Sequence, residues 1–144
     1  MKIWITAISF CFLIYLYSAC TASVFNNKDL DENMIDMMVY HDNLGMYLRE
    51  KDADYAEWLL EGMDSSLQVI ADKFPAHRKL NGPFKKYYQK KLVPPIDGIR
   101  KALRQQDFST AIIYYKTLTK NCNGCHIDND IDKDVVDWSD PSIH

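Results

Sequence analysis

Apolar residues recur every three or four positions through most of this chain, and this spacing constrains its fold more than any other feature. Residues spaced in this way lie along one face of an α-helix. No part of the same region alternates apolar and polar residues between turn signals, as a half-buried strand would. The sequence therefore predicts an all-α domain.

Helix-capping and helix-breaking residues divide the first half of this region into two helices. The first begins near Asp29, where acidic residues suit the positive end of a helix dipole, and ends near Lys51. Asp52 or Asp54 can cap the second helix. That helix ends before Pro75, because a residue that precedes proline avoids helical geometry. The first half is thus predicted to be a pair of helices with a very short connector.

The second half is predicted to contain two more helices. Pro83 can occupy the first turn of the third, which continues to Gln106. Pro94 and Pro95 must break or kink this helix, because proline lacks the backbone N–H donor. Asp107 caps the fourth helix. Helices of this length with short connectors predict an antiparallel four-helix bundle.

Residues 1–19 differ in character from the rest of the chain. A positively charged start is followed by an almost wholly apolar run from Ile3 to Tyr17 and then by small residues, which is typical of a secretory signal peptide. A membrane anchor is the alternative, but the run is shorter than the roughly 20 apolar residues that a spanning helix needs. We therefore expect a protein of the periplasm or the outer face of a bacterial membrane.

The residues from Leu16 to Cys20 resemble the signal of a bacterial lipoprotein, in which the cysteine becomes the lipidated first residue. Tyr17 stands where such signals usually carry an aliphatic residue. The resemblance implies lipidation of Cys20, anchorage to a membrane and a tether over residues 20–28. The alternative is ordinary cleavage near Cys20, which would leave an incidental thiol.

The cysteine count narrows the chemistry of the mature domain. Of the four cysteines, Cys11 lies in the signal segment and Cys20 at the predicted anchor. Only Cys122 and Cys125 remain for the folded domain. The formal charge of −3 gives no reason to expect a nucleic-acid partner.

The run Cys122-Asn123-Gly124-Cys125-His126 has the spacing of a c-type haem attachment site. Two cysteines three positions apart can each form a thioether to a haem vinyl group. A histidine beside the second cysteine can then bring a ring nitrogen to the iron. The sequence predicts one covalent haem c at Cys122, Cys125 and His126.

Three other interpretations of the cysteine pair fit the sequence less well. A thioredoxin-like redox pair sits at a helix start, where the thiol pKa is lowered, whereas this pair lies at a predicted helix end. A zinc site would need a fourth ligand from His41, His77 or an aspartate. A disulfide between Cys122 and Cys125 would close a very small loop and strain the backbone.

A Cys-x-x-Cys-His run close to the C-terminus, on the last helix of a predicted four-helix bundle, resembles cytochrome c prime and the class II c-type cytochromes. The resemblance covers residues 29–127, and its one sharp motif is the run from Cys122 to His126. It implies that His126 is the proximal iron ligand and that the chain is an electron carrier with a redox partner protein, not an enzyme. It leaves open a homodimer, which is common in that group.

The first helix is expected to cover the opposite face of the haem. Met34, Met37, Met38 and His41 lie on this helix, and Met38 and His41 share the face expected to point inward. Gly45 lies one turn beyond and could let the haem approach the backbone.

We predict His41 as the distal ligand. Met38 and His77 are alternatives, as is an open site that binds nitric oxide or carbon monoxide. On such a stripe, methionine is more often core filler and histidine a hydrogen-bonded core residue.

Two charged regions complete the sequence. Residues 128–144 form an acidic tail that is expected to be loose, and its alternating acids resemble a calcium loop. Lys133 and Ser139, however, stand where that loop needs glycine and a bidentate glutamate.

The third helix is basic. Its cations are either solvated or form a docking patch for an acidic redox partner. They are Lys85, Lys86, Lys90, Lys91, Arg100, Lys101 and Arg104.

Overall fold

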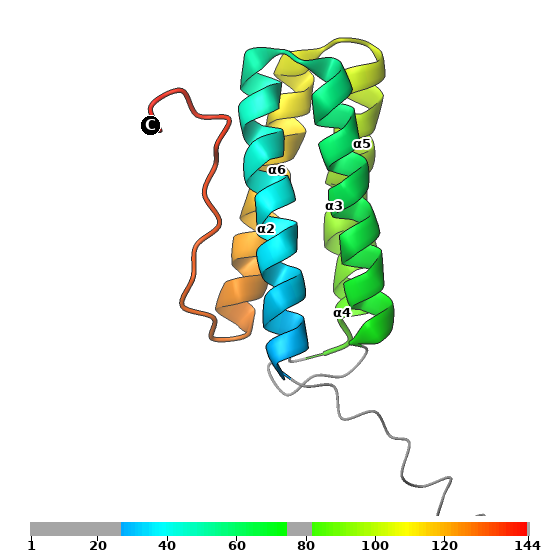
Figure 1. Ribbon diagram of the computed structural model, residues 1–144, viewed down its shortest axis with the longest axis vertical. Coiled ribbons are helices and arrows are strands. Elements are labelled where there is room, and N and C mark those ends of the chain that lie inside the picture. The colour runs from blue at the N-terminus through cyan, green and yellow to red at the C-terminus, as the bar shows by residue number, and fades with distance from the viewer. Residues whose placement is uncertain (1–26, 75–81, 144) are drawn as a thin grey trace, which may run out of the picture.

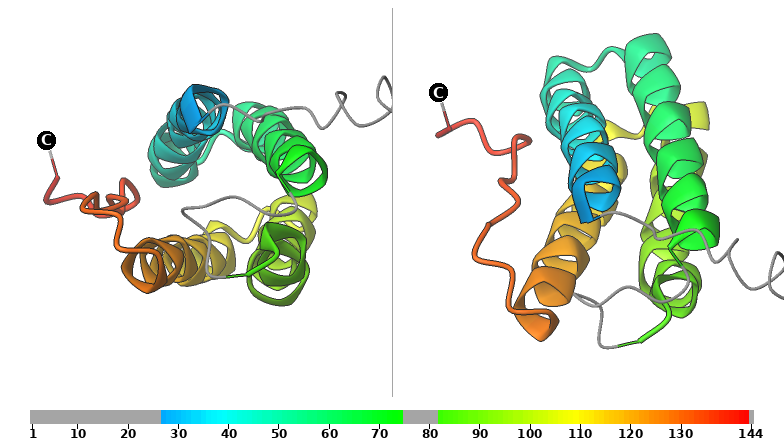
Figure 2. Two further views of the ribbon diagram at one scale, coloured as in Figure 1. Left: turned by 90° about the horizontal axis from the view of Figure 1, so that it is seen from below. Right: turned by 60° about the horizontal axis from the view of Figure 1, so that its bottom comes forward.

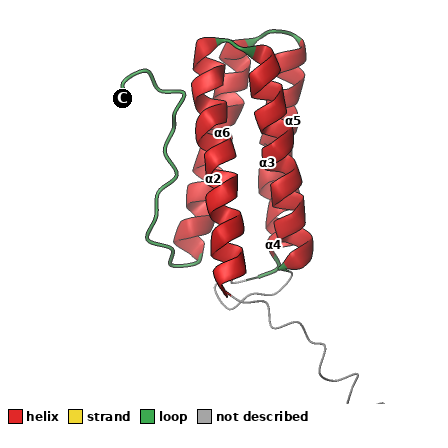
Figure 3. Cartoon of the chain, in the orientation of Figure 1, coloured by secondary structure: helices red, strands yellow, loops and turns green. Residues whose placement is uncertain are grey.

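A computed structural model describes residues 27–74 and 82–143, and within these ranges the chain forms helices and no strand (Figure 3). The helices are α2 (Asn27–Glu50), α3 (Ala53–Lys73), α4 (Phe84–Tyr87), the π-helical segment η2 (Tyr88–Leu92), α5 (Val93–Arg104) and α6 (Phe108–Asp128). Because α4, η2 and α5 follow one another without interruption, they form a single third rod. The predicted all-α class and the four-helix bundle are confirmed.

The four rods lie side by side around a common centre, as the end-on view shows (Figure 2). The colour ramp climbs α2, descends α3, climbs from α4 to α5 and descends α6 (Figure 1). The end of α6, which carries the Cys122–His126 run, therefore lies at the same end of the bundle as the start of α2. None of the helices in the described ranges is long and apolar enough to cross a membrane.

Two of the predicted capping residues begin helices as expected. The Asp52 side chain accepts a hydrogen bond from the backbone N–H of Tyr55 at 3.1 Å, so Asp52, and not Asp54, caps α3. The Asp107 side chain accepts one from the N–H of Thr110 at 3.0 Å and caps α6. A cap of this kind stabilises a helix by about 1 kcal/mol. These caps fix where the chain turns between rods.

The proline pair changes the third rod without breaking it. Pro94 and Pro95 provide no N–H, so the carbonyls of Lys90 and Lys91, four residues earlier, cannot accept the usual α-helical hydrogen bond. The backbone widens to π-helical geometry just before this point. The side chain of Asn121 in α6 donates to the Lys91 carbonyl at 2.6 Å. At the predicted kink the structure therefore has a π-helical turn, which Asn121 of α6 stabilises by a hydrogen bond.

The tail folds back along the bundle beside α6 and α2 (Figure 1). Arg49 donates to the carbonyls of Asp140 and Ile143, at 3.4 and 3.5 Å. Ser139 is only 4% exposed. The prediction of a loose tail was wrong for residues 129–143, because backbone carbonyls and buried side chains hold it against the helices.

Gly45 serves a different purpose from the predicted one. A Cβ at this position would overlap the Tyr115 hydroxyl and lie 2.9 Å from Cβ of Trp138. The missing side chain therefore lets α6 and the tail pack against α2. The prediction that Gly45 brings a haem close to the backbone was wrong, because Tyr115 and Trp138 occupy that space.

Candidate functional site

The Cys122–His126 run forms the last turns of α6. Cys122 is buried, Cys125 is partly buried, and both are free thiols. Burial raises the pKa of the Cys122 thiol to about 12 and also raises the pKa of Cys125. At neutral pH both sulfurs are therefore protonated, and a protonated thiol is a poor nucleophile. This is the opposite of what a thiol–disulfide exchange protein needs.

His126 is oriented by a hydrogen bond to the tail. Its Nδ1 lies 2.5 Å from the carbonyl oxygen of Lys133. A carbonyl can only accept, so Nδ1 is the donor, and in the neutral ring Nε2 then keeps its lone pair. Histidines that bind metals commonly donate their other ring N–H to a backbone carbonyl in this way. Nε2 of His126 is thus the nitrogen that can serve as a ligand.

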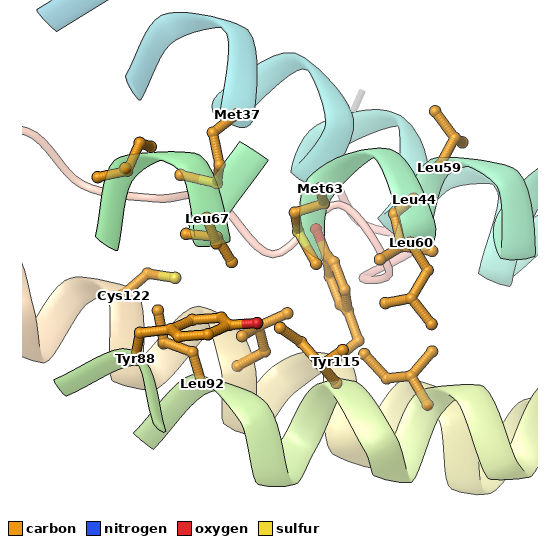
Figure 4. Packing of buried hydrophobic residues seen from close by; sticks show 14 of the residues in the cluster. Met37, Leu44, Leu59, Leu60, Met63, Leu67, Tyr88, Leu92, Tyr115 and Cys122 are labelled. Carbon is orange, nitrogen blue, oxygen red and sulfur yellow. The ribbon is translucent and has the colours of Figure 1, made fainter. Parts of the chain in front are cut away.

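One cavity of about 270 Å³ joins the predicted site residues. Its walls come from α2, α3, α4, η2, α6 and the tail. They are Leu30, Asp31, Met34, Ile35, Met37, Met38, His41, Leu67, Phe84, Leu92, Cys122, Cys125, His126, Ile131, Lys133, Asp134 and Val135. Figure 4 shows Cys122 beside Leu67 and Leu92 in this part of the core. Cys122, Cys125 and His126 therefore face a common space with His41, which is far from them in the sequence.

His41 is fully buried and is hydrogen-bonded through both ring nitrogens. Nε2 lies 2.9 Å from the Thr119 hydroxyl, which itself donates to the Tyr115 carbonyl. Because Thr119 uses its one proton there, it accepts from His41, and Nε2 carries a hydrogen. Nδ1 lies 3.1 Å from the Asp42 carboxylate and 3.2 Å from the Tyr115 hydroxyl. To bind a metal, His41 would have to exchange one of these partners, and its role as a ligand stays a prediction.

Three methionines of α2 also line the cavity. Met34, Met37 and Met38 lie within two turns of one another, and Met37 is almost fully buried. Methionine side chains are unbranched and adapt to the shape of what they contact. The wall formed by α2 can therefore accommodate different occupants more readily than a wall of branched residues.

The tail residues of the cavity wall were missed by sequence reasoning. Ile131 and Val135 alternate with acids in a segment that lacks helical periodicity, so no pattern marked them as buried. Cys20, His77 and His144 lie outside the described residues, as does most of the predicted tether. Among the residues that the structure does describe, no three His, Cys, Asp or Glu side chains are arranged to hold a metal ion, so the zinc interpretation finds no preformed ligand set.

Comparison with known proteins gives no relative. No protein-family model, no curated protein and no solved structure matches this chain. The cavity and its residues are therefore the basis for a functional proposal.

Proposed function

We propose that this chain is an exported, monohaem c-type cytochrome that transfers single electrons at the outer face of a membrane. The observation that carries the proposal is the meeting of Cys122, Cys125 and His126 at one mainly apolar cavity, with Nδ1 of His126 bonded to a backbone carbonyl so that Nε2 is the nitrogen left for a ligand. The two cysteines are reduced thiols, as the formation of thioethers requires.

The residues present fit a haem on three counts. Both cysteines are free thiols, so neither is committed to a disulfide. The bond to Nδ1 leaves the other ring nitrogen of His126 for a ligand, and the lining of the cavity is mainly apolar. The cavity lies just below the range of about 300–1,000 Å³ that is usual for ligand sites, and adaptable methionines form part of its wall.

In the proposed mechanism, Cys122 and Cys125 would hold the group through two thioethers, and His126 would bind the iron through Nε2. Bound haem supplies a one-electron iron couple. Leu67, Phe84 and Leu92 would keep water out, which limits the change in solvation when the charge changes. Lys133 would fix the ring of His126 through its carbonyl oxygen.

The distal side decides between two functions. We propose His41 as the distal ligand, which suits electron transfer because a second strong ligand closes the iron to other molecules. The engagement of both His41 nitrogens by Thr119, Asp42 and Tyr115 favours the second candidate, an open site that binds nitric oxide or carbon monoxide. Met38 lines the same cavity and is the alternative ligand.

Location and partner follow from the chain outside the cavity. We propose export by residues 1–19 and lipid anchorage at Cys20, which would hold the protein at the periplasmic or outer membrane surface. An acidic redox protein is the proposed partner, because exposed lysines such as Lys86, Lys90 and Lys91 lie on the rod beside Cys122. Electrostatic attraction between such surfaces accelerates encounter.

A spectroelectrochemical titration tests the function. The chain is produced with the haem-ligation machinery, and its visible spectrum is followed as the applied potential is changed. Electron transfer predicts a reversible one-electron transition and, with His41 bound, a low-spin ferric spectrum and a ferrous spectrum that carbon monoxide does not alter. A high-spin ferric spectrum, with carbon monoxide binding to the reduced protein, would select the gas-binding function instead. Protein that carries no haem would contradict both.

A further inference from the structure

The segment after α6 makes contacts that the proposed function does not explain. Residues 129–143, here called the proximal strap, leave the end of α6 and run back beside the bundle (Figure 1). Ile131, Lys133, Asp134 and Val135 of the strap line the cavity. A c-type attachment site needs only the two cysteines and the histidine. The strap therefore calls for a separate explanation.

The strap first closes a loop around His126. The backbone N–H of Ile131 donates to the carbonyl of His126 at 2.9 Å, and the N–H of Lys133 donates to the carbonyl of Ile131 at 2.9 Å. These two bonds fold the chain tightly enough to bring the Lys133 carbonyl within 2.5 Å of Nδ1 of His126. The acceptor for the imidazole is thus a backbone atom whose direction depends on the fold of the strap.

Asn123 fastens the strap two residues later. Its side-chain oxygen accepts from the N–H of Val135 at 2.6 Å, and its side-chain nitrogen donates to the Val135 carbonyl at 3.0 Å. The amide of Asn123 thus supplies both a donor and an acceptor to one residue of the strap. Asn123 lies between the two cysteines, so the same turn of α6 that carries the attachment site also holds the strap.

Two other anchors of the strap lie farther from His126. Trp138 packs at Gly45, and Arg49 donates to the Asp140 carbonyl at 3.4 Å. They hold the far end of the strap against α2. Within the described residues, and apart from His126 itself, the Asn123 pair is therefore the side-chain anchor nearest in sequence to Lys133.

We propose that Asn123 is a positioning residue that clamps the proximal strap so that the Lys133 carbonyl fixes His126 in the tautomer that can bind iron. The inference rests on the proposed function, in which His126 is the proximal ligand. A histidine whose Nδ1 has no acceptor is not held in the Nδ1–H form. When the clamp is lost, a proton returns to Nε2 for part of the time, and the ring is free to rotate.

The experiment measures the clamp and the tautomer separately, in the full chain produced without haem-ligation machinery and kept reduced. Long-range nitrogen–proton correlation spectra report which ring nitrogen of His126 carries the proton. Hydrogen exchange of the Val135 amide reports whether the clamp is closed. Asn123→Ala removes the clamp, and Asn43→Ala, which removes an exposed amide bonded to Val39 within α2, is the matched control.

The proposal expects the Nδ1–H form of His126 in the wild type and in Asn43→Ala. In Asn123→Ala, the Nε2–H form gains population and exchange of the Val135 amide accelerates by roughly tenfold. Asn123→Asp, which keeps the acceptor for the Val135 N–H and loses the donor, falls between the two. If Asn123→Ala fails to fold, Val135→Pro removes the N–H donor of the clamp without a change in α6, and the same tautomer shift is expected.

Two results would overturn the clamp: a wild-type His126 already in the Nε2–H form, or an Asn123→Ala chain with faster exchange and an unchanged tautomer. A Val135 amide that stays protected in Asn123→Ala would also overturn it. In the haem-loaded protein, loss of the bond to Lys133 makes the imidazole a weaker electron donor, so the reduction potential should rise. A chain that cannot be loaded with haem contradicts the proposed function, whereas the tautomer and exchange results test the clamp without haem.

Discussion

The two walls of the cavity are built in different ways. On the α6 wall, hydrogen bonds to backbone atoms hold the residues beside the thiols: Asn121 reaches Lys91, Asn123 reaches Val135 and Asn129 donates to the Cys125 carbonyl at 2.7 Å. On the α2 wall, the facing side chains are flexible methionines and a histidine engaged with other residues. Hydrogen bonds thus hold the residues of the α6 wall in one arrangement. The side chains of the α2 wall can change conformation, so more than one of them could serve as the distal ligand.

The largest effect is expected when the two cysteines of the α6 wall, the proposed attachment site, are removed. The double variant Cys122→Ala with Cys125→Ala should carry no covalent haem, because both thioether positions are lost. Haem staining of denatured protein measures this. Cys20→Ser is the matched control: it should keep the haem and lose the lipid. Covalent haem that persists in the double variant would place the attachment elsewhere.

Gly45→Ala against Gly124→Ala compares the packing tolerance of the two walls. A Cβ at Gly45 would meet Tyr115 and Trp138, so unfolding measurements should show a loss of about 1–3 kcal/mol. A Cβ at Gly124 would lie 3.6 Å from the Tyr87 hydroxyl, an ordinary contact, so that variant should be neutral or slightly stabilised. If both variants lose the same stability, the close contacts of Gly45 with Tyr115 and Trp138 do not explain the loss in Gly45→Ala.

The pH dependence of the haem-free chain tests the burial of Cys122. Its thiol pKa rises from 9.0 to about 12 on folding. Because the folded pKa is raised, the thiol contributes its stabilisation fully below about 9 and loses it as the pH rises toward about 12. Chemical unfolding across this window should show a steeper fall in stability for the wild type than for Cys122→Ala. Parallel curves would mean that the thiol is exposed.

Asn121→Ala gives the smallest expected effect and tests how far α6 stabilises η2. The variant leaves the Lys91 carbonyl without its donor beside the proline kink, and stability should fall by about 0.5–1.5 kcal/mol. Asn43→Ala, at an exposed site within α2, should change stability less. A larger loss in the control would show that η2 does not depend on α6 here.

Local signals predicted most of the scaffold. Asp52 and Asp107 cap helices where expected, and the spacing of apolar residues gave the bundle, because these features depend on residues close in the sequence. The strap was missed because its anchors are backbone carbonyls and the Asn123 amide, which leave no periodic pattern. The partners of His41 were also missed, since Thr119 and Tyr115 meet it only when α6 packs on α2.

The most direct test of the central claim is the intact mass of the chain under denaturing conditions, after production with the haem-ligation machinery. We predict a mass increase of one haem, with a pyridine haemochrome spectrum typical of two thioether bonds, and no increase in the Cys122→Ala, Cys125→Ala variant. An unmodified mass for the wild-type chain, with both thiols still open to alkylation after unfolding, would contradict the account.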